Sequence, residues 1–118
     1  MPSLHHVNIA VPRGRSAPIG AFYRDVLGLR EIPRPANENQ GVWLEIGDGT
    51  QLHLSERDGT PHPQVHFALT VDDLSAVRVR LGEAGALFEP ADDVFGTGGR
   101  GFTRDPAGNR VELIARKR

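Results

Sequence analysis

The chain has 118 residues, which is enough for one domain of ordinary size but not for two. Fourteen Lys and Arg against fifteen Asp and Glu give a net charge of −1, which argues against a general electrostatic grip on nucleic acid or on an anionic membrane. The absence of cysteine excludes disulfides, thiol nucleophiles and cysteine-based metal centres, and the lack of a long apolar run or a recognisable signal peptide leads us to expect a cytoplasmic protein.

The first half of the chain predicts one helix and four strands. Between residues 4 and 11, apolar side chains alternate with polar or small ones, which is typical of a half-buried strand. A helix is expected to begin with Ser16 as its cap and to end at Gly28, because apolar residues recur at helical spacing between them and glycine suits the left-handed residue after a helix. Three short strands are expected to follow, at residues 29–32, 42–46 and 51–54.

After a linker at about residues 56–64, rich in charge, Pro and Gly, the same order of elements returns. A strand is expected at residues 65–71, followed by a helix that Asp72 or Asp73 caps and Gly85 ends. The remaining strands are expected at residues 86–89, 101–104 and 111–115, with a Gly-rich loop at 90–101 and a tight turn at 105–109.

The two halves of the chain are a repeat. At an offset of about 60 residues, His6 falls on His66 and the strands on either side of the turns correspond in order. We therefore predict a single α+β domain, residues 1–118, built from two tandem βαβββ modules at about residues 4–55 and 65–115. The modules are expected to form a cup-shaped, mostly antiparallel sheet with the helices on its outer face.

One face of the predicted strands is polar and carries the candidate site. Because side chains alternate along a strand, this face gathers His6 and Asn8, Trp43 and Glu45, Gln51 and His53, His66 and Ala68, and Arg110 and Glu112. The repeat relates His6 to His66 and His53 to Glu112, so a pseudo-twofold axis would bring these four together.

Three imidazoles and one carboxylate suit a single divalent transition metal ion. We predict that His6, His53, His66 and Glu112 hold one such ion, with zinc, nickel, iron, manganese and cobalt all compatible with the ligand set. The residues alone leave an alternative open, in which only His6, His66 and Glu112 bind iron(II) and His53 acts beside them as an acid or base. His5 points to the other face by alternation and is expected to take no part.

The same face offers residues for catalysis and for substrate binding. The candidate catalytic residues are Glu112, His53 and Glu45, the last two as bases for proton transfer. Trp43 and Asn8 are expected to contact the substrate. Arg100 belongs to the predicted Gly-rich loop, where it would clamp a carboxylate or phosphate group.

The sequence resembles the vicinal oxygen chelate superfamily, the group of glyoxalase I, bleomycin-resistance proteins and extradiol dioxygenases. The resemblance runs over almost the whole chain and is carried most specifically by Phe22-Tyr23-Arg24-Asp25-Val26-Leu27-Gly28 and by Asp105-Pro106-Ala107-Gly108-Asn109-Arg110-Val111-Glu112. It implies paired βαβββ modules, a homodimer and, in many members, a divalent metal. It also implies that His6, His66 and Glu112 are ligands of that metal.

The chain departs from the superfamily pattern at His53. The matching position is Glu in bacterial glyoxalase I and Gln in methylmalonyl-CoA epimerase, so the resemblance supports a metal site more than glyoxalase activity. The potassium loop of fosfomycin-resistance transferases has no counterpart here. Bleomycin-binding members lack the metal ligands that this chain retains.

We expect a metal-dependent enzyme that acts on a small oxygenated metabolite by enolate chemistry, as an isomerase or lyase. Two alternatives stay open at this point: an iron(II)-dependent ring-cleavage dioxygenase and a non-catalytic, ligand-binding protein of the bleomycin-resistance kind. The sequence also leaves open whether the ligands come from one chain or from two. Nucleic acid and membranes are not expected as partners.

Overall fold

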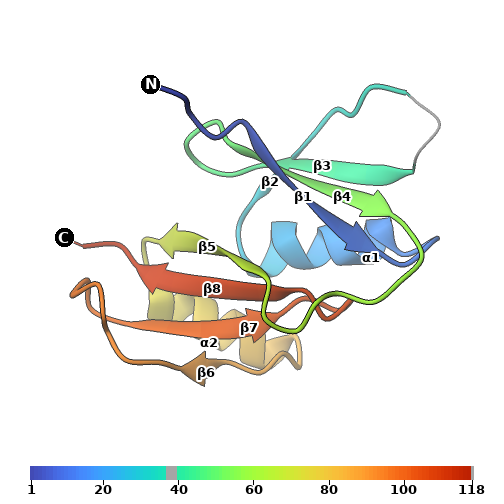
Figure 1. Ribbon diagram of the computed structural model, residues 1–118. Helices are drawn as coiled ribbons and strands as arrows, with labels where there is room; N and C mark the ends of the chain where they lie inside the picture. Colours follow the sequence, from blue (N-terminus) through green and yellow to red (C-terminus); the bar gives the residue numbers. More distant parts are fainter. Residues whose placement is uncertain (37–39, 118) are drawn as a thin grey trace. The chain divides into compact units, whose positions relative to one another are not determined.

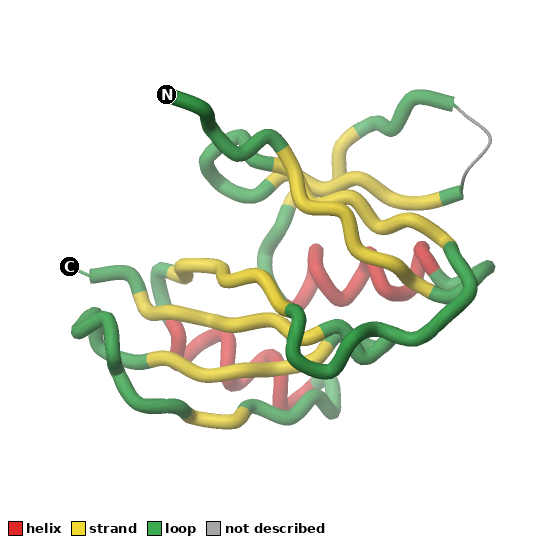
Figure 2. Tube along the Cα trace, in the orientation of Figure 1, coloured by secondary structure: helices red, strands yellow, loops and turns green. Residues whose placement is uncertain are grey.

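The computed structural model describes residues 1–36 and 40–117, and the chain divides into two compact units, Met1–Pro61 and His62–Arg118 (Figure 1). Each unit is a four-stranded mixed sheet with a helical segment lying across one face, as Figure 2 shows. The predicted α+β class and the two βαβββ modules are confirmed. None of the helices in the described ranges is long and apolar enough to cross a membrane.

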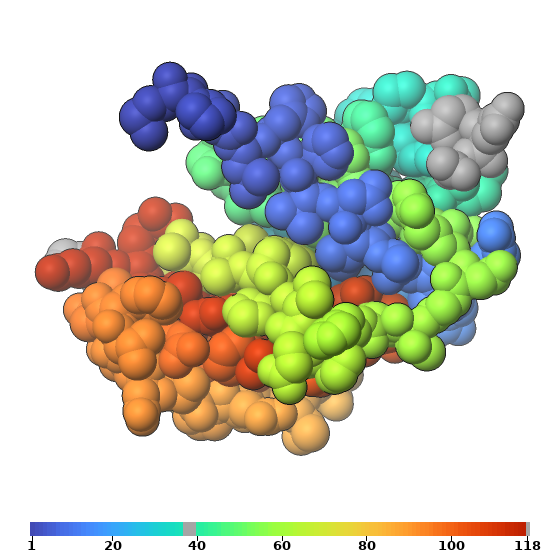
Figure 3. Space-filling view, in the orientation of Figure 1, coloured from blue at the N-terminus to red at the C-terminus, as the bar shows by residue number. Residues whose placement is uncertain are grey.

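In the first unit, the strands take the order β1-β4-β3-β2. β1 pairs with β4 in parallel, and the other two pairings are antiparallel. The elements of this unit are β1 (His6–Val11), α1 (Ser16–Ala21), the π-helix η1 (Phe22–Val26), β2 (Arg30–Ile32), β3 (Gly41–Glu45) and β4 (Gln51–Glu56). Ahead of β1, the N-terminal segment, dark blue in Figure 3, protrudes from this unit, and Met1 and Leu4 are exposed.

The predicted helix of the first unit ends at Gly28 as expected, with φ of 83° at that residue. Its second half, η1, is wound more widely than an α-helix, since the backbone N–H of Leu27 donates to the carbonyl of Phe22 over 3.3 Å. The apolar residues at helical spacing are buried against the sheet, among them Ile19 and Tyr23. The helix therefore supplies much of this unit's core.

Ser16 does not cap the helix with its own side chain, which corrects the sequence prediction. Glu56, at the end of β4, performs this function instead: its carboxylate accepts from the backbone N–H groups of Gly14 and Ser16 over 2.9 and 3.4 Å and from the Ser16 hydroxyl over 2.6 Å. These hydrogen bonds, led by the one from the Ser16 hydroxyl, lower the pKa of the Glu56 carboxyl. A strand residue distant in sequence thus satisfies the start of α1.

In the second unit, the strands take the order β5-β8-β7-β6, again with one parallel pairing, β5 with β8. The elements are β5 (His66–Val71), α2 (Leu74–Glu83), β6 (Glu89–Pro90), β7 (Arg100–Arg104) and β8 (Arg110–Ala115). The Asp73 side chain caps α2 by accepting from the N–H of Ala76, and Gly85 has φ of 75°, both as predicted. The predicted strand at 86–89 is displaced to β6.

The pairing registers of the two sheets correspond position by position. His6 lies opposite Gln51 in the first sheet, as His66 lies opposite Arg110 in the second. The core face of each sheet is apolar, with Leu44, Leu52 and Leu54 buried in the first unit and Leu69, Val111 and Leu113 in the second. Because side chains alternate, the opposite face of each sheet presents the polar residues that the sequence singled out.

Candidate functional site

A stack of three aromatic rings crosses the polar face of the first sheet. The rings of Trp43 on β3 and His53 on β4 are stacked with centroids 3.9 Å apart and planes 1° apart. On the other side of His53, the ring of His6 on β1 is stacked at 4.2 Å and 17°. The register explains the place of Trp43, which lies directly opposite His53, whereas His6 reaches His53 diagonally, since Asn8 is its partner on β1.

His53 is held in its neutral form. Burial is the main cause that lowers the pKa of its imidazole, and the nearby positive charges of His6, His5 and Arg34 lower it further. Its Nε2 lies 2.8 Å from Oε1 of Gln51, so Nε2 donates and Nδ1 carries the lone pair. A neutral imidazole of this kind can accept a proton or bind a metal ion.

His5 lies beside His6, against the orientation expected from alternation. Its Nδ1 lies 2.9 Å from Nδ1 of His6, and the two rings meet edge to face. The predicted orientation was wrong because His5 precedes β1, where the alternation of a strand does not apply, while its absence from the site stays a prediction. One of the two Nδ1 atoms donates and the other accepts, so this contact leaves Nε2 of His6 available to a ligand.

In the second unit, a carboxylate stands where the first unit has His53. Glu112 on β8 is buried, and its two oxygens have different partners: Oε1 lies 3.0 Å from Nε2 of His66, and Oε2 accepts from Nε of Arg100 over 2.6 Å. The Arg100 guanidinium also donates to the carbonyl of Asp92 over 3.0 Å. The arginine therefore fixes the carboxylate and leaves one of its oxygens turned to the histidine.

The contacts of His66 require a proton or a metal ion between its Nε2 and Glu112. Nδ1 lies 3.0 Å from the carbonyl oxygen of Gln64, which only accepts, so Nδ1 carries a proton. Nε2 faces Oε1 of Glu112, and two lone pairs at 3.0 Å repel each other unless a proton or a metal ion lies between them. The second unit thus holds an imidazole nitrogen and a carboxylate oxygen ready to share one cation.

The turn before β8 positions Glu112. Asp105 is buried, and its carboxylate accepts hydrogen bonds from the backbone N–H groups of Ala107 and Asn109 and from the Asn109 side chain, over 2.8 to 3.0 Å. Gly108 completes the turn with φ of 90°. The Asp-Pro-Ala-Gly-Asn stretch therefore sets the register of β7 on β8, and with it the place of Glu112.

The remaining candidate residues have partners within their own units. Asn8 donates to the Ser55 hydroxyl over 2.9 Å, and Glu45 forms an ion pair with Arg30 at 2.7 Å. Arg100 lies on β7, not in the predicted Gly-rich loop, and its guanidinium is committed to Glu112. The structure thus gives Arg100 a carboxylate of the protein as its partner.

Sequence reasoning missed Phe102 of the second unit, and it placed Arg110 on the polar face without predicting its contacts. The Phe102 ring meets the ring of His66 edge to face at 5.4 Å, and the Arg110 guanidinium lies over it at 3.8 Å. Phe102 pairs with Glu112 as Trp43 pairs with His53, so the repeat offered a signal for it.

The predicted metal ligands fall into two pairs, one in each unit. His6 and His53 are stacked in the first, and His66 and Glu112 are in contact in the second. Taken separately, neither unit gathers three or more His, Asp or Glu side chains into a metal-binding group among its described residues. A four-ligand site would therefore need both pairs.

Solved structures of related proteins share this architecture. A glyoxalase-family protein from Bacillus anthracis is 27% identical, with a TM-score of 0.86 over 99% of this chain and 97% of that one. The antibiotic binding protein TnmS3 from a Streptomyces species is 23% identical, with a TM-score of 0.74 over 99% and 98%. A variant of the fosfomycin resistance protein FosX from Listeria monocytogenes, in complex with Mn(II) and dihydroxypropylphosphonic acid, is 17% identical, with a TM-score of 0.79 over 99% and 94%.

No curated protein matches the chain. A family model does match, over residues 3–113, which covers both units and all the candidate site residues. This model describes one superfamily that unites glyoxalases, bleomycin resistance proteins and dioxygenases. Together with the two βαβββ modules, this places the chain: it belongs to the Glyoxalase/Bleomycin resistance protein/Dioxygenase superfamily.

Proposed function

We propose that this protein is a metal-dependent enzyme that acts on a small oxygenated substrate by enolate chemistry, as an isomerase or lyase. The observation that carries the proposal is the contact between Nε2 of His66 and Oε1 of Glu112 at 3.0 Å. Superfamily membership supports it, and so does the FosX complex with Mn(II), although that protein resembles this one only in fold.

The donor atoms of the second unit fit a divalent cation. Two ligand atoms at right angles around an ion, each at about 2.1 Å from it, lie about 3 Å apart. The separation of the two atoms of His66 and Glu112 agrees with this value. Gln64 fixes the tautomer of His66 through Nδ1, as outer partners of metal-bound histidines commonly do.

In this proposal His6 and His53 complete the ligand set, from the same chain or from a second copy in a homodimer. A bound divalent ion would act as a Lewis acid on two neighbouring oxygens of the substrate. The chain's own groups do the rest: Arg100 holds the Glu112 carboxylate in place, and Glu45, on the same face as His53, is the candidate that takes a proton from the substrate. Trp43 covers one face of the His53 ring and shields this ligand from water.

The test is metal content by elemental analysis of untagged protein, compared with Glu112→Gln. We expect about one equivalent per chain in the wild type and a loss of at least about tenfold in metal affinity in the variant. Glu83→Gln, at the end of α2, is the matched control and should bind normally. No metal in the wild type, even after incubation with Mn(II), Ni(II), Zn(II), Co(II) and Fe(II), would refute the proposal.

Trp43 provides an independent signal for metal binding in the first unit. It is the only tryptophan of the chain, and its ring is stacked on His53 at 3.9 Å. Metal binding to His53 should change the fluorescence of Trp43 in the wild type, whereas adding metal to His53→Gln should leave that fluorescence unchanged. An unchanged emission with one equivalent of metal bound would mean that His53 is not a ligand.

That outcome would favour the second candidate function, an iron(II)-dependent dioxygenase. In this alternative the His53 ring, stacked between Trp43 and His6, binds no metal, and His6, His66 and Glu112 remain as two histidines and one carboxylate. Oxygen uptake that requires iron would identify this chemistry.

A further inference from the structure

The polar faces of the two sheets differ in charge. At three corresponding register positions the second sheet has an arginine where the first has a neutral or an acidic residue: Arg100, Arg104 and Arg110 correspond to Gly41, Glu45 and Gln51. The only acid among these six positions, Glu45, is paired with Arg30. The second sheet therefore carries a local surplus of positive charge.

Only one of the three arginines has its charge neutralised. Arg100 is paired with Glu112, whereas Arg104 and Arg110 form no ion pair with any carboxylate in the described parts of the chain. Arg104 donates to the carbonyls of Gly108 and Pro63 over 3.0 and 3.1 Å, which hold its guanidinium in place. Two cations on the same face are thus positioned but not compensated.

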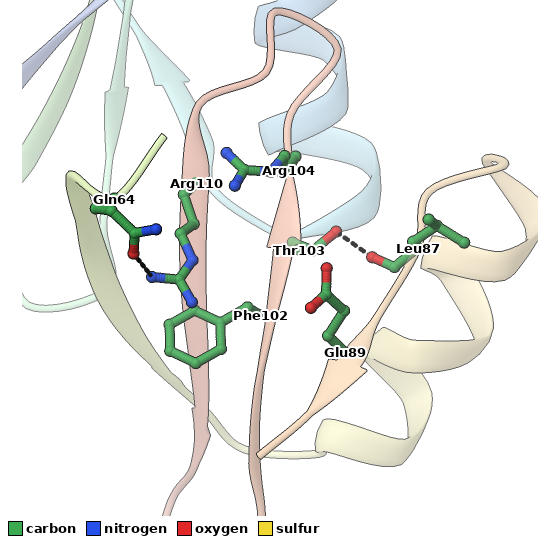
Figure 4. A pocket seen from close by; sticks show the side chains of 7 residues that line it. All are labelled: Gln64, Leu87, Glu89, Phe102, Thr103, Arg104 and Arg110. Atoms are coloured by element: carbon green, nitrogen blue, oxygen red, sulfur yellow. Dashed lines mark hydrogen bonds between the residues drawn. The ribbon is translucent and has the colours of Figure 1, made fainter. Parts of the chain in front are cut away.

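These two arginines line a pocket of about 410 Å³ in the second unit (Figure 4). Arg110 is half-buried, its guanidinium carbon lies 3.8 Å from the centroid of the Phe102 ring, and its Nη1 donates to Oε1 of Gln64 over 3.5 Å. A guanidinium stacked on an aromatic ring keeps its N–H groups at its edge, where they can bind an anion in two places. Phe102 also touches the ring of His66, so the pocket adjoins the proposed metal ligands.

We propose that this pocket binds an anionic oxygen group of the substrate, a carboxylate or a phosphoryl group, with Arg110 as its main partner and Arg104 as the second. The inference rests on the proposed function and deepens it, because it names the substrate class: a small metabolite with two oxygens for the metal and an anionic group beyond them. Glu89, on the opposite wall of the pocket, repels an anion and weakens binding.

The experiment uses metal-free protein and three probes: benzoate, phenyl phosphate and the neutral benzyl alcohol. Binding is followed by NMR, through the Nε–H signals of the arginines, and by calorimetry. We expect at least one anionic probe to bind and to shift the Arg110 signal, and benzyl alcohol to bind at least about tenfold more weakly. Whichever anion binds more tightly identifies the head group.

Arg110→Gln is the decisive variant, since Gln is the residue at the corresponding position of the first sheet. It should weaken the anionic probe by about tenfold or more, and Arg104→Gln should weaken it less. The matched control is Arg78→Gln on α2, because Arg78 also lies over an aromatic ring, that of Phe88 at 4.5 Å, but does not line the pocket. Arg110→Lys keeps the charge and should retain part of the affinity, which guards against a loss caused by misfolding.

Removing the opposing charge should have the reverse effect. Glu89→Gln is expected to tighten the anionic probe several-fold and to leave benzyl alcohol unchanged. Equal binding by wild type and Arg110→Gln, equal binding of benzoate and benzyl alcohol, or weaker anion binding in Glu89→Gln would each overturn the inference.

Repeating the titration after loading with Mn(II) separates the two proposals. Arg110-dependent anion binding by a protein that takes up no metal would sustain the anion site and refute the proposed enzyme. Normal metal uptake without any anion binding would refute the anion site and leave the proposed enzyme standing.

Discussion

The two units share one pairing scheme but hold their equivalent polar residues by different forces. In the first unit, His53 is packed between two rings, Trp43 and His6, and its charge is suppressed by burial. In the second, the corresponding Glu112 is charged and buried, and it is compensated by Arg100 and faced by His66. The repeat thus has a histidine at this position in one unit and a glutamate in the other, and the residues around each differ accordingly.

This difference shows how a repeat becomes a functional site. A neutral imidazole can be buried by stacking, whereas a carboxylate needs hydrogen-bonding cations when it leaves water. The second sheet meets this need with Arg100 at the position of Gly41, and the same face carries two further arginines. The asymmetry gives the first sheet a stacked, neutral imidazole and the second a buried carboxylate among arginines.

The largest expected effect concerns the turn that sets the register of the second sheet. Asp105→Ala removes a buried carboxylate that accepts three hydrogen bonds, and it should lower the free energy of unfolding by about 3 kcal/mol. Asp48, in the turn between β3 and β4, is exposed and accepts from the Thr50 N–H over 2.9 Å, so Asp48→Ala should cost much less. Urea unfolding of both variants tests the ranking; equal losses would contradict the role of Asp105.

The next prediction compares the ion pairs of the two units. Arg100→Met leaves one oxygen of the buried Glu112 without a donor, and it should cost about 2 kcal/mol in stability. Arg30→Met breaks the Arg30–Glu45 ion pair, in which 70% of the Arg30 side chain and 33% of the Glu45 side chain are exposed. This loss should cost less than about 1 kcal/mol in stability. Thermal unfolding checks both variants. A larger loss of stability in Arg30→Met than in Arg100→Met would contradict the prediction that the buried pair contributes more.

The smallest effect is a pH dependence that belongs to the first unit. Because the pKa of His53 is lower in the folded protein than its ordinary value of 6.5, the unfolded chain binds a proton more readily. Stability is therefore expected to fall as the pH drops below about 6.5, and His53→Gln should reduce this fall. His62→Gln, in the linker between the sheets, is the control. An unchanged pH profile in His53→Gln would show that His53 is not buried as a neutral ring.

Much of the fold was predictable because its signals are local. The alternation along β1 and β5, the glycines at 28 and 85, and the Asp73 cap each depend on neighbours within a few residues. The prediction for α1 failed because a distant residue, Glu56, caps it in place of Ser16, and the one for His5 failed because this residue precedes the strand.

The sequence by itself determined the repeat, the two βαβββ modules and the face on which His6, His53, His66 and Glu112 lie, because strand alternation and turn chemistry are encoded locally. Only the tertiary structure decided which groups these side chains meet. The stack on His53 and the pairing of Arg100 with Glu112 depend on the register between strands and on side-chain rotamers, which bring together residues far apart in the chain.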